Sequence, residues 1–477
     1  MRNVDFFYKQ DSDLMMSLRR VYLVIIIFHF SFLIPHSFSV LAQDLKPCGT
    51  SVLARRHVAD RGAAARTRFG KAPQQNTYLG EKRGLIILVE FPDLRFQDKD
   101  AFRTWSDIIN LEGYTNNMAP GSVSDYFQDQ SYGQFRLTFD VVGPVEARHE
   151  YAYYGKNIDW GPPTGWFDQN VGELVEEVCL AASDQVRFAD YDWNEDGEVE
   201  QVFLLYAGHG ENDYWSKDST VIWPHMASLT SDWDYEEALQ VQDVRVDTYA
   251  CGNEINRSNK LVGIGTFCHE FSHCLGLPDL YDTEKGNSIV GSYDLMDQGC
   301  YNGSGWCPVG YSSYERYACG WLTPREVTDP HGAIGSDPDG DLTRASEYYA
   351  VNPLSRYADA CLYRDTPEAN DYYLIEYRLK EKWDLYIPKQ GLLAWHIDYD
   401  KQAWADNTVN NDPKHLRVTR LTPDEIKTTA TDIVLRDNNK EPFTVYDMQG
   451  HRLSGPPAAP GIYIIKYADG ITKKCIR

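Results

Sequence analysis

The sequence predicts an α+β protein: a lobe of mixed strands and helices, then a β-rich, sandwich-like domain, and then a short β tail. Three observations support this prediction. Apolar runs such as GLIILVEFPD (84–93) alternate with segments of helical spacing. Aromatic, alternating runs follow, among them DYYLIEYRL and GLLAWHIDYD. The last residues again carry strand-like runs. At 477 residues, the chain is long enough for two or three domains.

The elements of the first lobe follow from local patterns. Continuous β-branched runs indicate buried strands, and a Ser before an apolar period indicates a helix cap. The elements predicted in this way are strand 84–93, a helix opening at Ser122, strand 134–145, helix 166–182, strand 198–210 and a His-rich helix within 265–282.

The first 42 residues have the features of a signal peptide. Arg19 and Arg20 precede the apolar run VYLVIIIFHFSFLI, and Val40-Leu41-Ala42 offers a cleavage site before Gln43. We therefore expect export of the protein, to the medium or the cell surface. No later segment is apolar enough to span a bilayer, so no permanent membrane span is expected.

The charge of the chain is strongly negative and unevenly distributed. The formal net charge is −24, which argues against nucleic acid as a partner because no basic patch is available to meet phosphates. Residues 43–83 nevertheless contain nine Lys or Arg and three Asp or Glu. We interpret residues 43–80 as a pro-segment whose basic side chains could dock on the acidic body. A solvated, flexible lead-in is the alternative.

The stretch GTFCHEFSHCLGLPDLYD (265–282) has the spacing of a metal site. His269 and His273 are four residues apart, so on a helix both rings can reach one ion. Glu270 lies beside the first ligand and can act as a general base on a water at a zinc ion. Gly276 permits a sharp turn that would deliver Asp279 as a third ligand.

Two other acids could take the place of Asp279. Asp282 lies one turn further along, and Glu315 in SSYERYACGW could approach from a second helix. Asp279 is favoured because the turn at Gly276 otherwise has no purpose. Met296 in GSYDLMDQG would form an apolar floor below the ion.

These motifs resemble the immune inhibitor A family of secreted bacterial metallopeptidases. Blocks similar to those of the family run in its order over roughly residues 84–415: LIILVEFPD, GSVSDYFQDQSYGQF, YDWNEDGEVEQVFLLYAG, IWPHMASL, HEFSHCLGLPDLYD with SYDLMD, YERYACGWL and the aromatic strands after residue 370.

The resemblance implies a fold and an activity. The fold is a zincin-type catalytic domain at 81–324, a twisted mixed sheet with an active-site helix, followed by a β-rich domain at 325–422. The activity is that of a zinc metalloendopeptidase, made as a zymogen and acting on proteins or peptides. By residue-to-residue carry-over, His269, His273 and Asp279 would bind one zinc, Glu270 would be the general base, and Met296 the Met-turn residue. The alternative function is a binding or adhesion protein on an inactive zincin scaffold, against which the intact Glu270 argues.

A second metal site is suggested by DWNEDGEVE (192–200). Asp192, Asn194, Asp196 and Glu198 supply oxygen at alternate positions around Gly197, as a structural calcium loop does. Phe203 stands where such a loop needs its bidentate Glu, so this is not a complete calcium loop, and a polar turn is the alternative.

Three further segments carry weaker signals. The tail at 433–477, with VYDMQGHRL and GIYIIKYADGITKKCIR, resembles the C-terminal sorting domain read by the type IX secretion system, which would make that machinery a partner. Cys48 in LKPCGT is similar to the cysteine of matrixin pro-segments, but the segment lacks their arginine, so a disulfide or an idle thiol is favoured. His396, Asp398 and the run Asn407-Thr-Val-Asn-Asn could bind a second ion, although a packing role for them is favoured.

Overall fold

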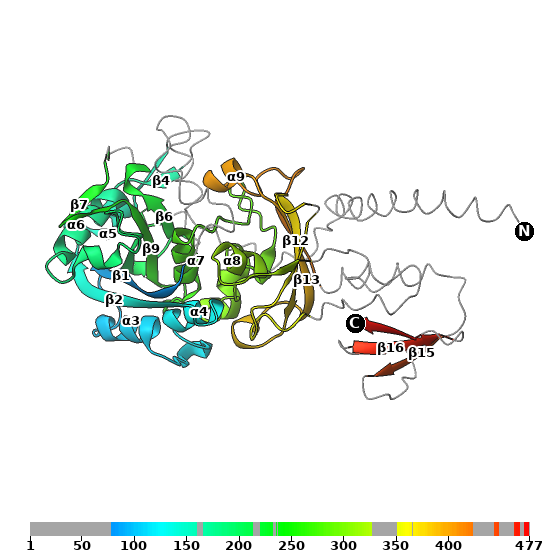
Figure 1. Ribbon diagram of the computed structural model, residues 1–477. Coiled ribbons are helices and arrows are strands. Elements are labelled where there is room, and N and C mark those ends of the chain that lie inside the picture. The colour runs from blue at the N-terminus through cyan, green and yellow to red at the C-terminus, as the bar shows by residue number, and fades with distance from the viewer. Residues whose placement is uncertain are drawn as a thin grey trace, which may run out of the picture. The chain divides into compact units, whose positions relative to one another are not determined.

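The computed structural model describes residues 78–159, 166–212, 220–231, 235, 237–326, 351–364, 366–422, 443–447, 462–467 and 472–476. The predicted signal peptide, Cys48 and nearly all of the predicted pro-segment lie outside these residues. Within them, the chain is a mixture of helices and strands, as Figure 1 shows, and it has the α+β character that the sequence predicts.

Strands and helices alternate along the first lobe, and strands dominate after residue 325. The strands are β1 Gly80–Glu90, β2 Phe135–Glu146, β3 Asn157–Asp159, β4 Trp166–Asp168, β5 Val202–His209, β6 His225–Ser228, β7 Leu239–Val241, β8 Val244–Val246, β9 Thr248–Ile255, β10 Arg325–Glu326, β11 Cys361–Tyr363, β12 Asp371–Arg378, β13 Gly391–Asp398, β14 Val418–Leu421, β15 Phe443–Asp447, β16 Ile462–Tyr467 and β17 Thr472–Ile476. The α-helices are α3 Ala101–Asn110, α4 Val123–Gln130, α5 Tyr151–Gly155, α6 Val171–Ala182, α7 Gly265–Cys274, α8 Ser313–Ala318 and α9 Lys401–Ala405. Short 3₁₀ segments are η2 Asn116–Met118, η3 Phe188–Tyr191, η4 Leu229–Ser231, η5 Gly291–Tyr293, η6 Gln298–Gly305 and η7 Lys382–Asp384.

The first lobe is built on a five-stranded mixed sheet in the order β2-β1-β5-β9-β6. Strands β2, β1, β5 and β9 run parallel, and β6 pairs antiparallel with β9 at one edge. The interior strand β1, paired with β2 and β5, is the apolar run that the sequence marks, and residues 85–89 within it are fully buried. A strand that is covered on both faces needs such a continuous apolar run, because its alternate side chains enter two different cores.

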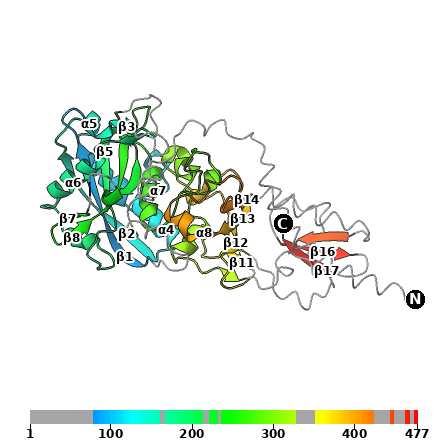
Figure 2. The ribbon, with the colours of Figure 1, turned by 90° about the horizontal axis from the view of Figure 1, so that it is seen from above.

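The two faces of this sheet carry separate cores. Ile86 and Leu88 join the core that contains α3, α4 and α7. Leu85 and Ile87 point to the opposite face, into the core that contains α6. Helices therefore cover both sides of the sheet, and α7 lies on the same side as α3 and α4 (Figures 1 and 2).

Two helix starts can be compared with the sequence prediction. Helix α4 is capped by Ser122, whose side chain accepts from the Asp125 amide while the Asp125 side chain accepts from the Ser122 amide, so the predicted cap is confirmed. The helix expected from residue 166 begins only at Val171. The preceding residues form β4, whose backbone pairs antiparallel with β3, and this tertiary pairing overrides the helical spacing.

The β-rich region contains a five-stranded sheet in the order β10-β11-β12-β13-β14. Burial alternates strictly along β12 and β13, as the sequence predicts for strands with one covered face. The covered face does not pack against a second sheet in the described residues. Its side chains, such as Leu374 and Trp395, instead join the same core as α7 and α8. The region is thus β-rich as predicted, but its sheet is covered by helices and loops of the first lobe.

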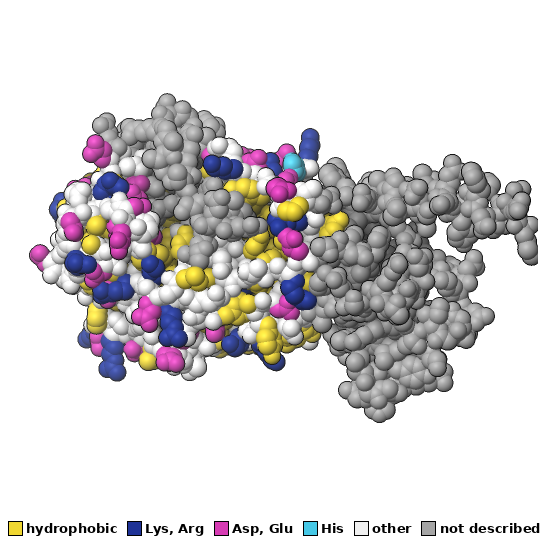
Figure 3. Space-filling view, in the orientation of Figure 1, with side chains coloured by type: hydrophobic (Ala, Val, Ile, Leu, Met, Phe, Trp, Pro, Cys, Tyr) yellow, Lys and Arg dark blue, Asp and Glu magenta, His cyan; other side chains and the backbone are white. Residues whose placement is uncertain are grey.

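The C-terminal tail has a small sheet of its own. β15 pairs with β16, and β16 pairs with β17, all antiparallel. Among the residues that the structure describes, none forms a helix of the length and apolarity that a membrane span needs. On the face drawn in Figure 3, acidic and basic side chains are interspersed over the described part of the chain.

Candidate metal centre

The site is built on α7, which is anchored to the sheet by two phenylalanines one turn apart. Phe267 and Phe271 pack into the core below the helix and contact Phe139 of β2. At the first residue, a Cβ on Gly265 would lie only 1.8 Å from the carbonyl oxygen of Cys300. Only glycine allows this approach, so α7 is held tightly against the η6 segment.

Both histidines of α7 have their orientation fixed by backbone carbonyls. His269 Nδ1 lies 2.8 Å from the carbonyl oxygen of Leu295, and His273 Nδ1 lies 2.8 Å from that of Leu277. A carbonyl only accepts, so each Nδ1 carries the hydrogen and each Nε2 remains as the ligand atom. This is the arrangement by which proteins orient histidines that bind a metal.

Asp279 brings a carboxylate to the two ligand nitrogens. Its Oδ1 lies 3.1 Å from His269 Nε2 and 3.5 Å from His273 Nε2. A tetrahedral zinc with bonds of about 2.0–2.1 Å separates its ligand atoms by roughly 3.3–3.4 Å. The donor set of two imidazoles and one carboxylate, at these separations, fits a zinc ion.

The turn at Gly276 delivers Asp279 to this position. Helix α7 ends at Cys274, and Gly276 has a φ of 84°, in the left-handed region that favours glycine. Its amide donates to the His273 carbonyl at 2.9 Å, which closes the helix end. The predicted role of Gly276 in reversing the chain is confirmed.

Burial and charge favour a cation at this site. Burial lowers the pKa of His273 to about 4, so its ring is neutral at pH 7. Burial alone would raise the pKa of Asp279, but His273, His269 and Asn407 together lower it below its usual value. The lone pairs of the neutral ring and of the carboxylate then point toward each other and repel. A cation between them removes this repulsion.

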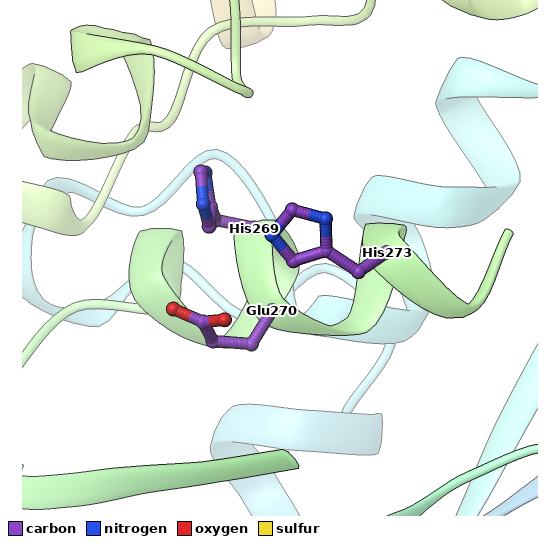
Figure 4. Close-up of side chains that lie close together, drawn as sticks. All are labelled: His269, Glu270 and His273. Atoms are coloured by element: carbon purple, nitrogen blue, oxygen red, sulfur yellow. The ribbon is translucent and has the colours of Figure 1, made fainter. Parts of the chain in front are cut away.

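Glu270 is fully buried and lies next to the histidines on α7. One of its carboxylate oxygens lies within 4.8 Å of a ring nitrogen of each histidine. Figure 4 shows the two rings on one side of the helix and the Glu270 carboxylate projecting from the neighbouring side. The carboxylate is therefore close to the candidate metal position while a different residue, Asp279, lies between the nitrogens.

The segment around Met296 supports both the helix and the turn. The Leu295 carbonyl orients His269, and the Met296 carbonyl accepts from the Leu280 amide at 2.8 Å. The Met296 side chain is fully buried in the core that includes α7. This segment therefore fixes the position of the turn that carries Asp279 relative to the two histidines.

The two rival acids have other partners. Asp282 accepts from the amides of Glu284 and Lys285 and pairs with the Lys285 side chain at 3.4 Å. Glu315 is buried at the start of α8, where it accepts from the amide and hydroxyl of Ser312. Of these three acids, Asp279 is the one that the structure brings to the histidine nitrogens.

The acidic loop at 192–200 is organised differently. Asp192 accepts from the amides of Asp196 and Gly197, Asn194 accepts from the Asp196 amide, and Asp196 accepts from the Glu198 amide. The side chain of Glu198 pairs with Arg245 at 3.6 Å. The loop thus caps its own backbone, as an acidic turn does.

Sequence reasoning missed the groups that orient the ligands. The carbonyls of Leu277 and Leu295 have no signal in residue type, because every residue has a carbonyl. Asn407 lies 128 residues beyond Asp279, and its side chain hydrogen-bonds to that carboxylate. The run Asn407-Thr-Val-Asn-Asn stands out in the sequence as a cluster of amides, but its partner cannot be read from the sequence.

A mixed sheet, an active-site helix with an HExxH pattern and a carboxylate delivered by a glycine turn together define a zincin-like metallopeptidase domain. Comparison with protein-family models agrees: residues 73–320 match the catalytic domain of the immune inhibitor A peptidase M6 family. The chain belongs to this family.

Several known proteins that are named as metallopeptidases or as immune inhibitor A are similar to the chain. It is 24% identical over 277 residues to the pre-pro-metalloprotease PrtV of Vibrio cholerae serotype O1, covering 50% of the chain and 30% of that protein. It is 24% identical over 294 residues to immune inhibitor A of Bacillus thuringiensis subsp. alesti, covering 51% and 41%. A putative secreted metallopeptidase of Arthroderma benhamiae is 25% identical over 230 residues, covering 42% and 32%. The similarity therefore spans less than half of the length of each relative.

Proposed function

We propose that the protein is a secreted, zinc-dependent endopeptidase that hydrolyses peptide bonds in proteins. The observation that carries this proposal is the position of Asp279 Oδ1, 3.1 and 3.5 Å from the ligand nitrogens of His269 and His273. Its family and the names of its relatives support a metallopeptidase.

Each residue of the site has a distinct role in this proposal. His269, His273 and Asp279 would hold zinc, which supplies polarisation of a carbonyl and acidification of water when bound. Glu270 accepts a proton from the attacking water at its carboxylate and donates it to the nitrogen of the leaving amine. Glu270 is fully buried, and electrostatic interactions are stronger in such a low-dielectric setting than in water. Met296 supports the site from below.

The proposal is tested by identifying peptides released from a protein mixture by the purified mature protein, with and without a chelator. We expect release that the chelator abolishes and that added zinc restores. A Glu270→Gln protein should bind zinc and release almost nothing. Equal release by both proteins would instead leave the binding or adhesion function.

Export and maturation form a second part of the proposal. Residues 1–42 would be removed as a signal peptide, and residues 43–80 would keep the zymogen latent; a contact of Cys48 with the zinc is less favoured than a disulfide or an idle thiol. The mature chain would then comprise the catalytic domain at 81–324 and the β-rich domain at 325–422. The N-terminal sequence of the protein in the medium, and the latency of a Cys48→Ser variant, test these steps.

The tail at 433–477 would serve as the sorting signal for type IX secretion in a bacterium. Its resemblance to such domains supports this, and the tail has its own small sheet of β15, β16 and β17. Deletion of residues 435–477 should leave the protein inside the cell envelope. Normal export of the shortened protein would show that the tail has another role.

The last part of the proposal is a structural calcium ion bound by the acidic loop at 192–200. Asp192, Asn194, Asp196 and Glu198 would be its ligands, with the Glu200 carboxylate, which accepts from the Trp193 amide at 2.6 Å, closing the loop. The spacing of oxygen-bearing side chains supports this part. Thermal unfolding with and without calcium tests it, since an ion bound only by the folded chain raises the unfolding temperature.

A further inference from the structure

The β-rich region contains a short segment whose amide side chains reach back to the first lobe. This segment, residues 407–411, follows helix α9 and supplies Asn407, Asn410 and Asn411. All three side chains hydrogen-bond to the turn at 279–283, which lies about 128 residues earlier in the chain. Asn407 and Asn410 are buried. The turn that carries the candidate third ligand is thus held by a segment of the β-rich region.

Asn407 holds Asp279 at two points. Its Nδ2 donates to Asp279 Oδ2 at 2.6 Å, and its Oδ1 accepts from the Asp279 amide at 2.7 Å. The φ of Asn407 is 52°, a left-handed conformation that asparagine tolerates better than most residues. That conformation and complete burial fix the amide plane against the carboxylate.

The clamp distinguishes the two oxygens of Asp279. Oδ2 is occupied by the Asn407 amide, whereas Oδ1 faces His269 Nε2 and His273 Nε2 at 3.1 and 3.5 Å. A hydrogen bond to a charged oxygen is short and strong, so it opposes rotation of the carboxylate. With Oδ2 held, the carboxylate can offer only Oδ1 to an ion between the histidines.

We propose that Asn407 is a positioning residue of the metal centre, which orients Asp279 so that a single oxygen binds zinc. The inference rests on the proposed function, because it takes Asp279 as a zinc ligand. It also extends the metal centre beyond residue 320, where the match to the family's catalytic domain ends. The β-rich region then contributes to metal binding as well as to packing.

The other two asparagines make contacts of a different kind. Asn410 donates to the carbonyls of Leu280 and Val418, and it accepts from backbone amides of its own region. Asn411 Oδ1 accepts from the amide and the hydroxyl of Thr283, at 2.8 and 2.9 Å. Asn411 therefore makes two hydrogen bonds to the same turn as Asn407 does, but none of them reaches Asp279. It is a matched control for a merely structural role.

The test compares zinc affinity in the full chain by competition with a chromophoric chelator. Asn407→Gly removes the clamp and accepts the left-handed conformation, and Asn407→Asp keeps the volume but places an acceptor against Asp279 Oδ2. Loss of a residue that orients a ligand lowers metal affinity by about 10–100-fold. We expect this loss for both Asn407→Gly and Asn407→Asp, since neither side chain donates to Asp279 Oδ2, and a near-normal affinity for Asn411→Ala.

Cobalt(II) gives a second readout that stability alone does not change. In the cobalt-loaded protein, the visible absorption depends on the ligands and their geometry, so both Asn407 variants should shift the band and Asn411→Ala should not. Thermal unfolding of the metal-free proteins is measured in parallel. A lower unfolding temperature of the Asn407 variants than of Asn411→Ala, with an unchanged cobalt spectrum, would overturn the positioning role.

Wild-type protein and Asp279→Ala separate this inference from the proposed function. If wild type takes up no zinc, or Asp279→Ala keeps it, the proposed metal centre itself is wrong. If Asp279→Ala loses zinc while both Asn407 variants bind it as wild type does, only the role of Asn407 is wrong.

Discussion

Two regions of this protein have the oxygen and nitrogen side chains of a metal site in their sequence, and the structure treats them differently. At α7, the partners of the candidate ligands come from other segments: Leu295 for His269, and Asn407 for Asp279. In the acidic loop at 192–200, the side chains bond to amides of the same loop. Partners from outside α7 orient His269 and Asp279 before any ion arrives. In the second loop, the Asp192 and Asp196 carboxylates instead bond to the loop's own backbone, although Arg245 also contacts the loop.

The difference shows what makes a metal site more than a cluster of suitable residues. At α7, each histidine uses one ring nitrogen for its support and presents the other to a shared point. In the loop, the carboxylates already serve the backbone as turn formers, and such turns occur with or without a cation. Substitutions in the two regions test this contrast, and the largest effect is expected at α7.

Glu270→Gln should reduce peptide-bond hydrolysis by about 10²–10⁴-fold, because the amide cannot accept the proton of the attacking water. Zinc content should remain near one per chain, since Glu270 is not among the proposed ligands. Steady-state rates and elemental analysis of the same preparation measure both. Loss of zinc together with activity would contradict the division of roles at α7.

Asp279→Ala should lower zinc affinity by at least about 100-fold, more than the loss of a residue that only orients a ligand. Asp282→Ala is the matched control, because that carboxylate is engaged by the nearby amides of Glu284 and Lys285. Competition with a chelator measures both variants. Full zinc occupancy of the Asp279 variant, or loss from the Asp282 variant, would mean that the third ligand is wrongly assigned.

Buried carboxyl groups that are not proposed to bind a metal ion should instead be protonated over part of the pH range. Burial raises the pKa of Asp294 to about 7, and burial with the nearby Asp294 raises that of Glu315 well above its usual value. In the unfolded chain, Asp294 titrates near 3.8. Between these two pKa values, the folded protein therefore binds more protons than the unfolded chain does. The contribution of Asp294 to the free energy of unfolding is present below about pH 4 and is lost as the pH rises through about 7.

Replacing Asp294 with Asn should flatten this dependence. Denaturant unfolding of the metal-free protein at about pH 5, 6, 7 and 8 would measure it, and the slope of stability against pH should become less negative by up to about one proton per chain. Asp282→Asn is a suitable comparison, because that carboxylate is held by local amides and a lysine. An unchanged slope in the Asp294 variant would mean that this carboxyl is ionised throughout the range.

The smallest effect is expected at the acidic loop. If the loop binds calcium, calcium raises the unfolding temperature of wild type by mass action. We expect a rise of a few degrees, and none in a variant that combines Asp192→Ala with Asp196→Ala. An equal rise in both proteins would place the calcium elsewhere, and no rise in either would leave the loop as an acidic turn.

The extent of sequence prediction varies with the range of the interactions involved. Strand β1, the Ser122 cap and the turn at Gly276 follow from neighbouring residues, and the sequence predicts each correctly. Helical spacing predicts that α6 starts at residue 166, whereas the helix begins at Val171, because β4 pairs with β3. Spacing alone cannot reveal a backbone partner. The alternation along β12 and β13 predicts a covered face, but not that helices of the first lobe cover it.

The sequence by itself indicated the family, through blocks that resemble it in order, and the α+β class, through strand and helix patterns. It also determined the helix on which two histidines and a glutamate share adjacent faces, because that depends on a spacing of about 3.6 residues per turn. Only the tertiary structure decided which of three acids meets the histidines and which residue holds it there. Asp279 and Asn407 are brought together by the packing of the β-rich sheet against helices and loops of the first lobe, and a contact across 128 residues leaves no periodic trace in the chain.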